Sequence, residues 1–154
     1  MYERILVPSD GSSFSDGAIR EAARLASELG STLVLFYAVP FYAVPQYQLA
    51  PVMDDLPAVE STADRQLLQK YAEAQARSVF DAAQGLAGLP QERMERHFVM
   101  SNSPYEAIID AARDMSCDLI VMASHGRRGL AGFLLGSETQ KVLAHSRLPV
   151  LVVR

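Results

Sequence analysis

A glycine-rich segment followed by a hydroxyl group is the part of this chain whose residue types are best suited to chemistry. Its glycines are Gly126, Gly129, Gly132 and Gly136, with Arg127 and Arg128 between the first two and Ser137 after the last. Glycines let backbone N–H groups approach an anion closely, and a helix N-terminus adds unpaired donors and a positive dipole end. Guanidinium and hydroxyl groups suit phosphate oxygens. The segment therefore predicts a phosphate-binding loop, with a merely flexible surface loop as the alternative.

The residues on either side of these glycines predict what holds the loop. Leu119 to Ala123 is a short apolar run, typical of a strand buried on both faces. Ser137 to Leu143 reads as the first turns of a helix. No Gly-Lys-Ser or Gly-Lys-Thr follows the glycines, and no Gly-x-Gly-x-x-Gly is present, so neither the P-loop nor the dinucleotide fingerprint is met.

Other polar residues lie where they could contribute to such a site. Asp10 follows an apolar run and has two interpretations, an acceptor for ligand hydroxyls or a cap for the next helix. His125 precedes the loop, and its residue type suits a general base, but no partner at triad spacing is evident. We expect it to orient the loop. The remaining histidines and Cys117 are scattered, without metal-ligand spacing.

Alternating strand and helix patterns predict the elements that position these residues. We expect strands at 5–7, 32–39, 93–100, 119–123 and 149–153, and helices at 13–29, 61–87, 104–115 and 137–146. Such alternation predicts a doubly wound α/β sheet. Gly30 stands where a helix C′ glycine belongs. Ser103, Pro104 and Glu106 have the pattern of a capping box with proline at the first helical position.

The segment 41–60 is irregular and rich in proline. A surface loop that joins a strand to a helix is the simpler interpretation. A loop of this length is unusual unless it covers or contacts something, so a lid or an interface remains the alternative.

Length and composition restrict the function classes. The 154 residues suit one domain, and 49% apolar with 21% charged residues is ordinary for a globular protein. The net charge of −4 argues against a nucleic-acid-binding surface. No apolar run is long enough to span a bilayer, and the N-terminus enters a strand directly, without the pattern of a signal peptide. A single cysteine cannot form an internal disulfide, so we expect a cytoplasmic protein. Because no apolar run is long enough, we expect that it is not itself a membrane protein.

The sequence resembles the universal stress protein family. Its ATP-binding members have a glycine, a second glycine three positions later, and a third ten positions further on, followed by Ser or Thr. Here Gly126, Gly136 and Ser137 fill the last three places, and Ala123 stands at the first. Pro8-Ser9-Asp10-Gly11-Ser12 is similar to the family's Pro-Thr-Asp-Gly-Ser, and Asn102 stands where many members have glycine in a turn that we expect to be kept through a left-handed backbone.

The resemblance implies a fold, a ligand and the residues that bind it. It implies one domain over residues 1–154, with a five-stranded parallel sheet in the order 3-2-1-4-5 and four helices. It implies ATP as the cofactor, with Mg²⁺ or Mn²⁺ carried by the phosphates and no metal ligands from the protein. The ATP-binding residues expected from it are Pro8, Ser9, Asp10, Ala38, Met122, Ala123, Gly126, Arg127, Gly129, Gly136, Ser137, Glu138 and Thr139.

The resemblance also implies a regulatory, stress-response role rather than catalysis. The nucleotide state would modulate a client, such as a membrane transporter or a signalling protein. The loop offers arginines but no lysine, so we expect ATP hydrolysis to be slow or absent and assign no catalytic residue. Two alternatives remain. One is a slow ATPase or other ATP-consuming enzyme with this sheet. The other is an interaction module that binds no nucleotide, which is favoured by Ala123 at the place of the family's first glycine.

A homodimer is expected through the last strand. Val150, Leu151, Val152 and Val153 are apolar on both faces, and an exposed apolar edge invites strand pairing. Members of the family commonly dimerise in this way. A neighbouring loop that covers the edge is the alternative.

Overall fold

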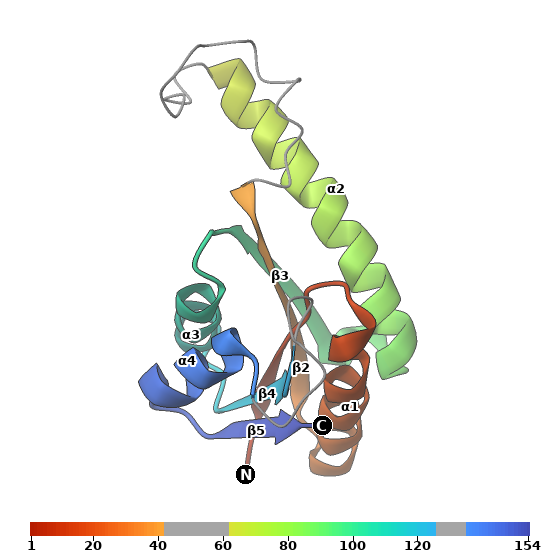
Figure 1. Cartoon of the computed structure of the whole chain (residues 1–154). Helices are drawn as coiled ribbons and strands as arrows, with labels where there is room; N and C mark the ends of the chain where they lie inside the picture. Colours follow the sequence, from red (N-terminus) through yellow and green to blue (C-terminus); the bar gives the residue numbers. More distant parts are fainter. Residues whose placement is uncertain (42–61, 126–134) are drawn as a thin grey trace.

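A parallel sheet in the order β3-β2-β1-β4-β5 forms the centre of the computed structural model (Figure 1). The structure describes residues 1–41, 62–125 and 135–154. Its strands are β1 (Arg4–Pro8), β2 (Thr32–Val39), β3 (Met94–Met100), β4 (Leu119–Ala123) and β5 (Val150–Val153). The predicted parallel sheet and its strand order are confirmed.

The α-helices cover the sheet in two layers (Figure 1). α1 (Asp16–Leu29) and α2 (Thr62–Ala87) share one apolar core, and α3 (Pro104–Asp114) and α4 (Ser137–His145) pack on the other side. Two short 3₁₀ turns, η1 (Ser13–Ser15) and η4 (Gln91–Arg93), precede α1 and β3. The four predicted helices are therefore present on both faces of a doubly wound sheet.

Burial explains why the central strands are apolar almost throughout. Ile5, Leu6 and Val7 of β1 are completely buried. Successive side chains of a strand point to opposite faces, so Ile5 and Val7 pack in the core with α1 and α2, whereas Leu6 packs in the core with α3 and α4. A strand with helices on both faces has no solvent side that would favour polar residues.

The predicted end of α1 is confirmed, but its predicted start is not. Gly30 has a φ of 74°, and its N–H bonds to the carbonyl of Ala26, which confirms the C′ glycine. The start was predicted too early, because residues 13–15 form the 3₁₀ turn η1 before the α-helix begins at Asp16. The Ser15 hydroxyl donates to the Ser12 carbonyl and tightens this turn.

The predicted capping box at the start of α3 is wrong in its main contact. Ser103 makes no side-chain cap hydrogen bond, although Pro104 does occupy the first helical position. The N–H of Tyr105 instead donates to Glu138 Oε2 of α4, at 2.9 Å. A carboxylate from a neighbouring helix thus caps α3, a contact between segments far apart in the sequence.

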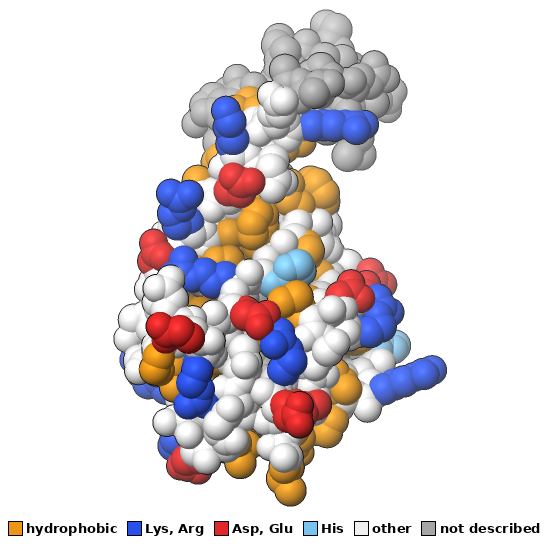
Figure 2. Space-filling model, turned by 180° about the vertical axis from the view of Figure 1, so that it is seen from behind, with side chains coloured by type: hydrophobic (Ala, Val, Ile, Leu, Met, Phe, Trp, Pro, Cys, Tyr) orange, Lys and Arg blue, Asp and Glu red, His pale blue; other side chains and the backbone are white. Residues whose placement is uncertain are grey.

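Charges of both signs are interspersed over the face shown in Figure 2. In the described part of the chain, no helix combines the length and the apolar character that crossing a membrane requires. Most of the predicted irregular segment, residues 42–60, lies outside the described residues, so its proposed lid or interface role stays a prediction.

Candidate functional site

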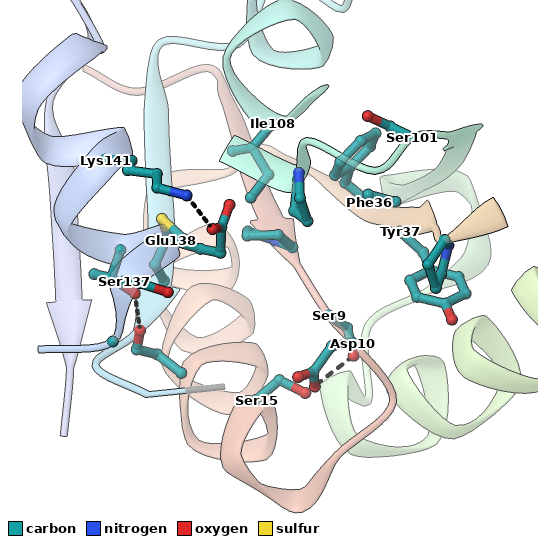
Figure 3. A pocket seen from close by; sticks show the side chains of 18 of the residues that line it. Ser9, Asp10, Ser15, Phe36, Tyr37, Ser101, Ile108, Ser137, Glu138 and Lys141 are labelled. Carbon is teal, nitrogen blue, oxygen red and sulfur yellow. Dashed lines mark hydrogen bonds and ion pairs between the residues drawn. The ribbon is translucent and has the colours of Figure 1, made fainter. Parts of the chain in front are cut away.

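A pocket of about 440 Å³ opens where the strand order reverses, at the carboxyl ends of β1 and β4. This is where open α/β sheets bind their ligands. The walls come from the ends of β1, β2, β3 and β4 and from the starts of α3 and α4 (Figure 3). The lining residues are Pro8, Ser9, Asp10, Ser15, Phe36, Tyr37, Ala38, Pro40, Ser101, Asn102, Pro104, Ile108, Met122, Ala123, His125, Gly136, Ser137, Glu138, Thr139 and Lys141.

The end of β1 contributes a hydrogen-bonded turn. Asp10 Oδ1 accepts from the N–H of Ser12 at 2.9 Å and from its hydroxyl at 2.5 Å. The hydroxyls of Ser9 and Ser15 lie 3.0 Å apart and are buried. Asp10 therefore stabilises the entry to η1 and α1 while it lines the pocket, so both interpretations of this carboxylate agree with the geometry.

The start of α4 is fixed to the end of β4 by two hydrogen bonds. The N–H of Gly136 donates to the Ser124 carbonyl at 2.7 Å, and the buried Thr139 hydroxyl donates to the Ala123 carbonyl at 2.9 Å. Ser137, Glu138 and Thr139 form the first turn, whose N–H groups have no partner one turn earlier in the helix. All three residues line the pocket, so the positive end of the helix dipole faces it.

Ala123 occupies the place of the family's first glycine without an unusual backbone. It is the last residue of β4, and the described non-glycine residues with positive φ are Tyr2 and Ser116. A left-handed conformation is therefore not required at position 123, and its methyl group packs at the edge of the core shared with α1 and α2.

A lysine that the sequence interpretation missed lies in the pocket wall. Lys141 Nζ is 2.8 Å from Glu138 Oε1 and 5.2 Å from the centre of the Tyr105 ring. The hydrogen bond that Lys141 donates to Glu138 raises the pKa of this ammonium group. The glycine loop contains no lysine, but Lys141 lies four residues after Ser137 and returns to the same side of α4 after one helical turn.

The far end of the pocket is formed by the ends of β2 and β3. Tyr37, Ala38 and Pro40 come from β2 and its exit, and Asn102 follows β3. Asn102 does not adopt the expected left-handed backbone. Its side-chain oxygen instead accepts from the N–H of Phe41 at 3.1 Å and joins the two strand exits.

Most residues of the predicted site come together in this pocket. Those that line it are Pro8, Ser9, Asp10, Ala38, Met122, Ala123, Gly136, Ser137, Glu138 and Thr139. Gly126, Arg127 and Gly129 lie outside the described residues. Reasoning from the sequence did not find Ser15, Phe36, Pro104 or Ile108, because only the packing of α1, β2 and α3 turns them towards the same space.

The histidines and the cysteine that could have carried chemistry have packing or hydrogen-bond contacts that explain their positions. His125 lines the pocket, with Nδ1 3.1 Å from the Ser124 hydroxyl, and His97 stacks on Phe36. Burial raises the pKa of the Cys117 thiol to about 11, so it is protonated at neutral pH and has little nucleophilic character. Across the described ranges, no cluster of three or more His, Cys, Asp or Glu side chains is arranged to hold a metal ion.

Comparison with known proteins extends over the whole chain. The sequence matches the model of the Universal stress protein family over residues 1–154. It is 32% identical to a universal stress protein of Thermus aquaticus, over the full length of both chains. A universal stress protein from Lactobacillus plantarum superimposes with a TM-score of 0.73 at 25% identity, covering 99% of this chain and 98% of the other. A universal stress protein crystallised in complex with cAMP superimposes with a TM-score of 0.64 at 26% identity, covering 99% and 97%.

Proposed function

Because the chain belongs to the universal stress protein family, we propose that it is a regulatory protein that binds ATP. The observation that carries the proposal is that the N-terminus of α4 opens into a pocket at the reversal of strand order. A helix N-terminus favours phosphate, and the volume of about 440 Å³ lies within the range of small-molecule sites, about 300–1,000 Å³.

The proposed binding mode follows the shape of the pocket. The phosphates lie over the first turn of α4, where Ser137 and the backbone N–H groups provide donors, and over the glycine loop that precedes it. The adenosine lies between Asp10 and Ala38. Asp10 accepts from the ribose hydroxyls, and the backbone at Ala38 contacts the base edge. We propose that Mg²⁺ or Mn²⁺ enters with the phosphates.

The neighbour that binds cAMP supports an adenine nucleotide as the ligand class. The pocket has a carboxylate, Asp10, after β1 and the positive terminus of α4 after β4, and these groups suit a ligand that carries both sugar hydroxyls and phosphates. We propose that the protein binds this ligand without converting it. Its role would then be signalling in the cytoplasm, in which the nucleotide state changes the affinity for a protein client.

A second candidate function is a nucleotide-free interaction module, which Ala123 favours. Its methyl group stands at the place where the family motif has glycine, which has no side chain. The ordinary backbone at this residue argues that the substitution is tolerated without distortion, and we therefore prefer the nucleotide-binding function.

Calorimetric titration of the purified full chain with ATP and Mg²⁺ tests the proposal. We expect saturable, one-to-one binding of ATP and weaker binding of CTP, whose base cannot make the same edge contact. cAMP in a parallel titration shows whether a triphosphate is needed. If protein stripped of bound nucleotide gives no heat with ATP or cAMP, nucleotide binding is refuted and the interaction-module function remains.

A further inference from the structure

Lys141 is the one lysine or arginine among the described residues that line the pocket. It comes from the second turn of α4, and its ammonium group points towards the Glu138 carboxylate in the pocket wall (Figure 3). Its side chain is 49% exposed, against 34% for Glu138. A cation that can reach both its ion-pair partner and the open pocket has a second possible partner, the ligand.

Glu138 holds Lys141 with one carboxylate oxygen and α3 with the other. Oε1 is 2.8 Å from Lys141 Nζ, and Oε2 accepts from the N–H of Tyr105 at 2.9 Å. The contact with Tyr105 fixes the carboxylate, because that N–H belongs to the first turn of α3. Lys141 is therefore paired with a carboxylate that has a second contact on α3, independent of the lysine.

The charges of the described pocket explain why this pair matters. Asp10 and Glu138 bring two carboxylates, and Lys141 brings the compensating cation. A phosphate that enters beside Glu138 meets repulsion unless a cation comes with it. A partly exposed ion pair contributes little to stability, so Lys141 leaves Glu138 at small cost. Its hydrogen bond to a phosphate oxygen would also be charge-assisted, and a phosphate group carries more negative charge than one carboxylate.

We propose that Lys141 is a phosphate-binding side chain of this pocket, in addition to Ser137, and that Glu138 keeps it beside the pocket until the ligand arrives. The pair then determines specificity: phosphorylated ligands gain the Lys141 contact, and the unphosphorylated nucleoside does not. This inference rests on the proposed function, because it assigns the phosphate end of the same site.

Titration of adenosine, AMP and ATP against three forms of the full chain tests the assignment. Lys141→Met should weaken AMP and ATP binding by about tenfold or more, as expected for a lost charge-assisted contact, and leave adenosine binding unchanged. Glu138→Gln should strengthen ATP binding by about two- to fivefold at low salt, less at high salt, because it removes a negative charge and keeps an acceptor for Tyr105. Lys70→Met, an exposed lysine on α2, is the matched control and should change nothing.

The outcomes separate this inference from the function on which it rests. If wild type and Lys141→Met bind ATP equally well, the proposed role of Lys141 is overturned, whereas the proposal of ATP binding stands. A loss of the same factor for adenosine and ATP also overturns it, because that pattern indicates a structural role. Wild type that binds none of the three ligands overturns both. Circular dichroism melting of each variant shows whether it is folded under the titration conditions.

Discussion

At the scale of single residues, Gly136 is the N-cap of α4 and lines the pocket. Its φ of −57° and ψ of 147° are ordinary for any residue, so valine is compatible with the backbone. A valine would nevertheless project from the helix terminus at which we place the phosphates. We expect Gly136→Val to weaken ATP binding by about tenfold, about 1.4 kcal/mol, in calorimetric titration.

Gly85→Val is the control for this substitution. Gly85 is an exposed residue of α2, with open space where its Cβ would stand. Equal ATP affinity in Gly136→Val and wild type would contradict the position of the phosphates, whatever the result for the control.

His125 is the residue that would have to act if the protein hydrolysed ATP rapidly. Fast phosphoryl transfer requires a positioned nucleophile and stabilisation of charge that develops only in the transition state. In the proposed site, Ser137, Lys141 and the backbone donors of α4 would bind phosphate before and after transfer alike. We expect phosphate release with Mg²⁺ to stay below about 1 s⁻¹, the lower end of the usual enzyme range.

Phosphate release by wild type and by His125→Ala, measured side by side, checks this expectation. Turnover near 1 s⁻¹ or above that disappears in His125→Ala would identify an enzyme and refute the binding role. A trace activity of the same size in both forms indicates slow background hydrolysis in the site.

At the scale of elements, an ion pair joins β1 to β3 across the intervening β2. The Arg4 guanidinium forms two parallel hydrogen bonds to Glu95, at 2.9 and 2.7 Å, and its Nε donates to the Met115 carbonyl. The hydrogen bonds from Arg4 lower the pKa of Glu95. The two side chains are 27% and 42% exposed, so solvent screening reduces the contribution of the pair.

We expect Glu95→Gln to lower the free energy of unfolding by up to about 1 kcal/mol at pH 7 in urea titrations. A carboxyl group with a depressed folded-state pKa contributes stability above its unfolded-state pKa and loses it as the pH falls through the folded-state value. The difference between wild type and variant should therefore shrink below about pH 4.

Glu28→Gln, which removes an exposed carboxylate that pairs with Arg24 within α1, is the comparison for this experiment. It should cost less, because its partner also pairs with Glu21. A wild-type advantage over Glu95→Gln that stays constant from pH 7 to pH 3 would show that ionisation of Glu95 is not its source.

At the scale of the whole molecule, β5 presents an apolar edge that a second copy could continue. Leu151 is 37% exposed. The N–H groups of Ile120 and Ser124 donate to the carbonyls of Pro149 and Val153, so these alternate residues face β4. The strand alternates, and the backbone groups of Val150 and Val152 therefore face outward.

This geometry makes proline at position 152 a sharp test of the proposed homodimer. Val152→Pro removes an outward N–H and leaves the ladder to β4 intact, since the N–H it deletes does not face β4. We expect light scattering to give a dimer for wild type and a monomer for the variant. Arg96→Pro, an outward position on the opposite edge strand β3, should remain dimeric. A monomeric wild type would refute the dimer, and an unchanged mass for Val152→Pro would refute the β5 contact.

The sequence by itself determined the elements and one end of the site. A strand buried on both faces must be apolar, and a helix must end where Gly30 supplies a left-handed residue, so the order of strands and helices follows from local rules. The end of the pocket at which we place the phosphates was also predictable, because Gly136, Ser137 and Thr139 are neighbours in the chain and line the pocket at one helix terminus.

Only the tertiary structure decided which distant residues share the pocket and which contacts fix them. The position of Lys141 depends on the rotation of α4 against β4, which the Thr139 contact with Ala123 fixes. Glu138 replaced the predicted capping box because α3 and α4 pack side by side, and a carboxylate on one helix then lies within hydrogen-bond distance of the first N–H groups of the other. Local rules are satisfied by neighbours in sequence, whereas this pocket is formed by segments as far apart in the chain as Pro8 and Lys141. Their juxtaposition is set by how the layers pack.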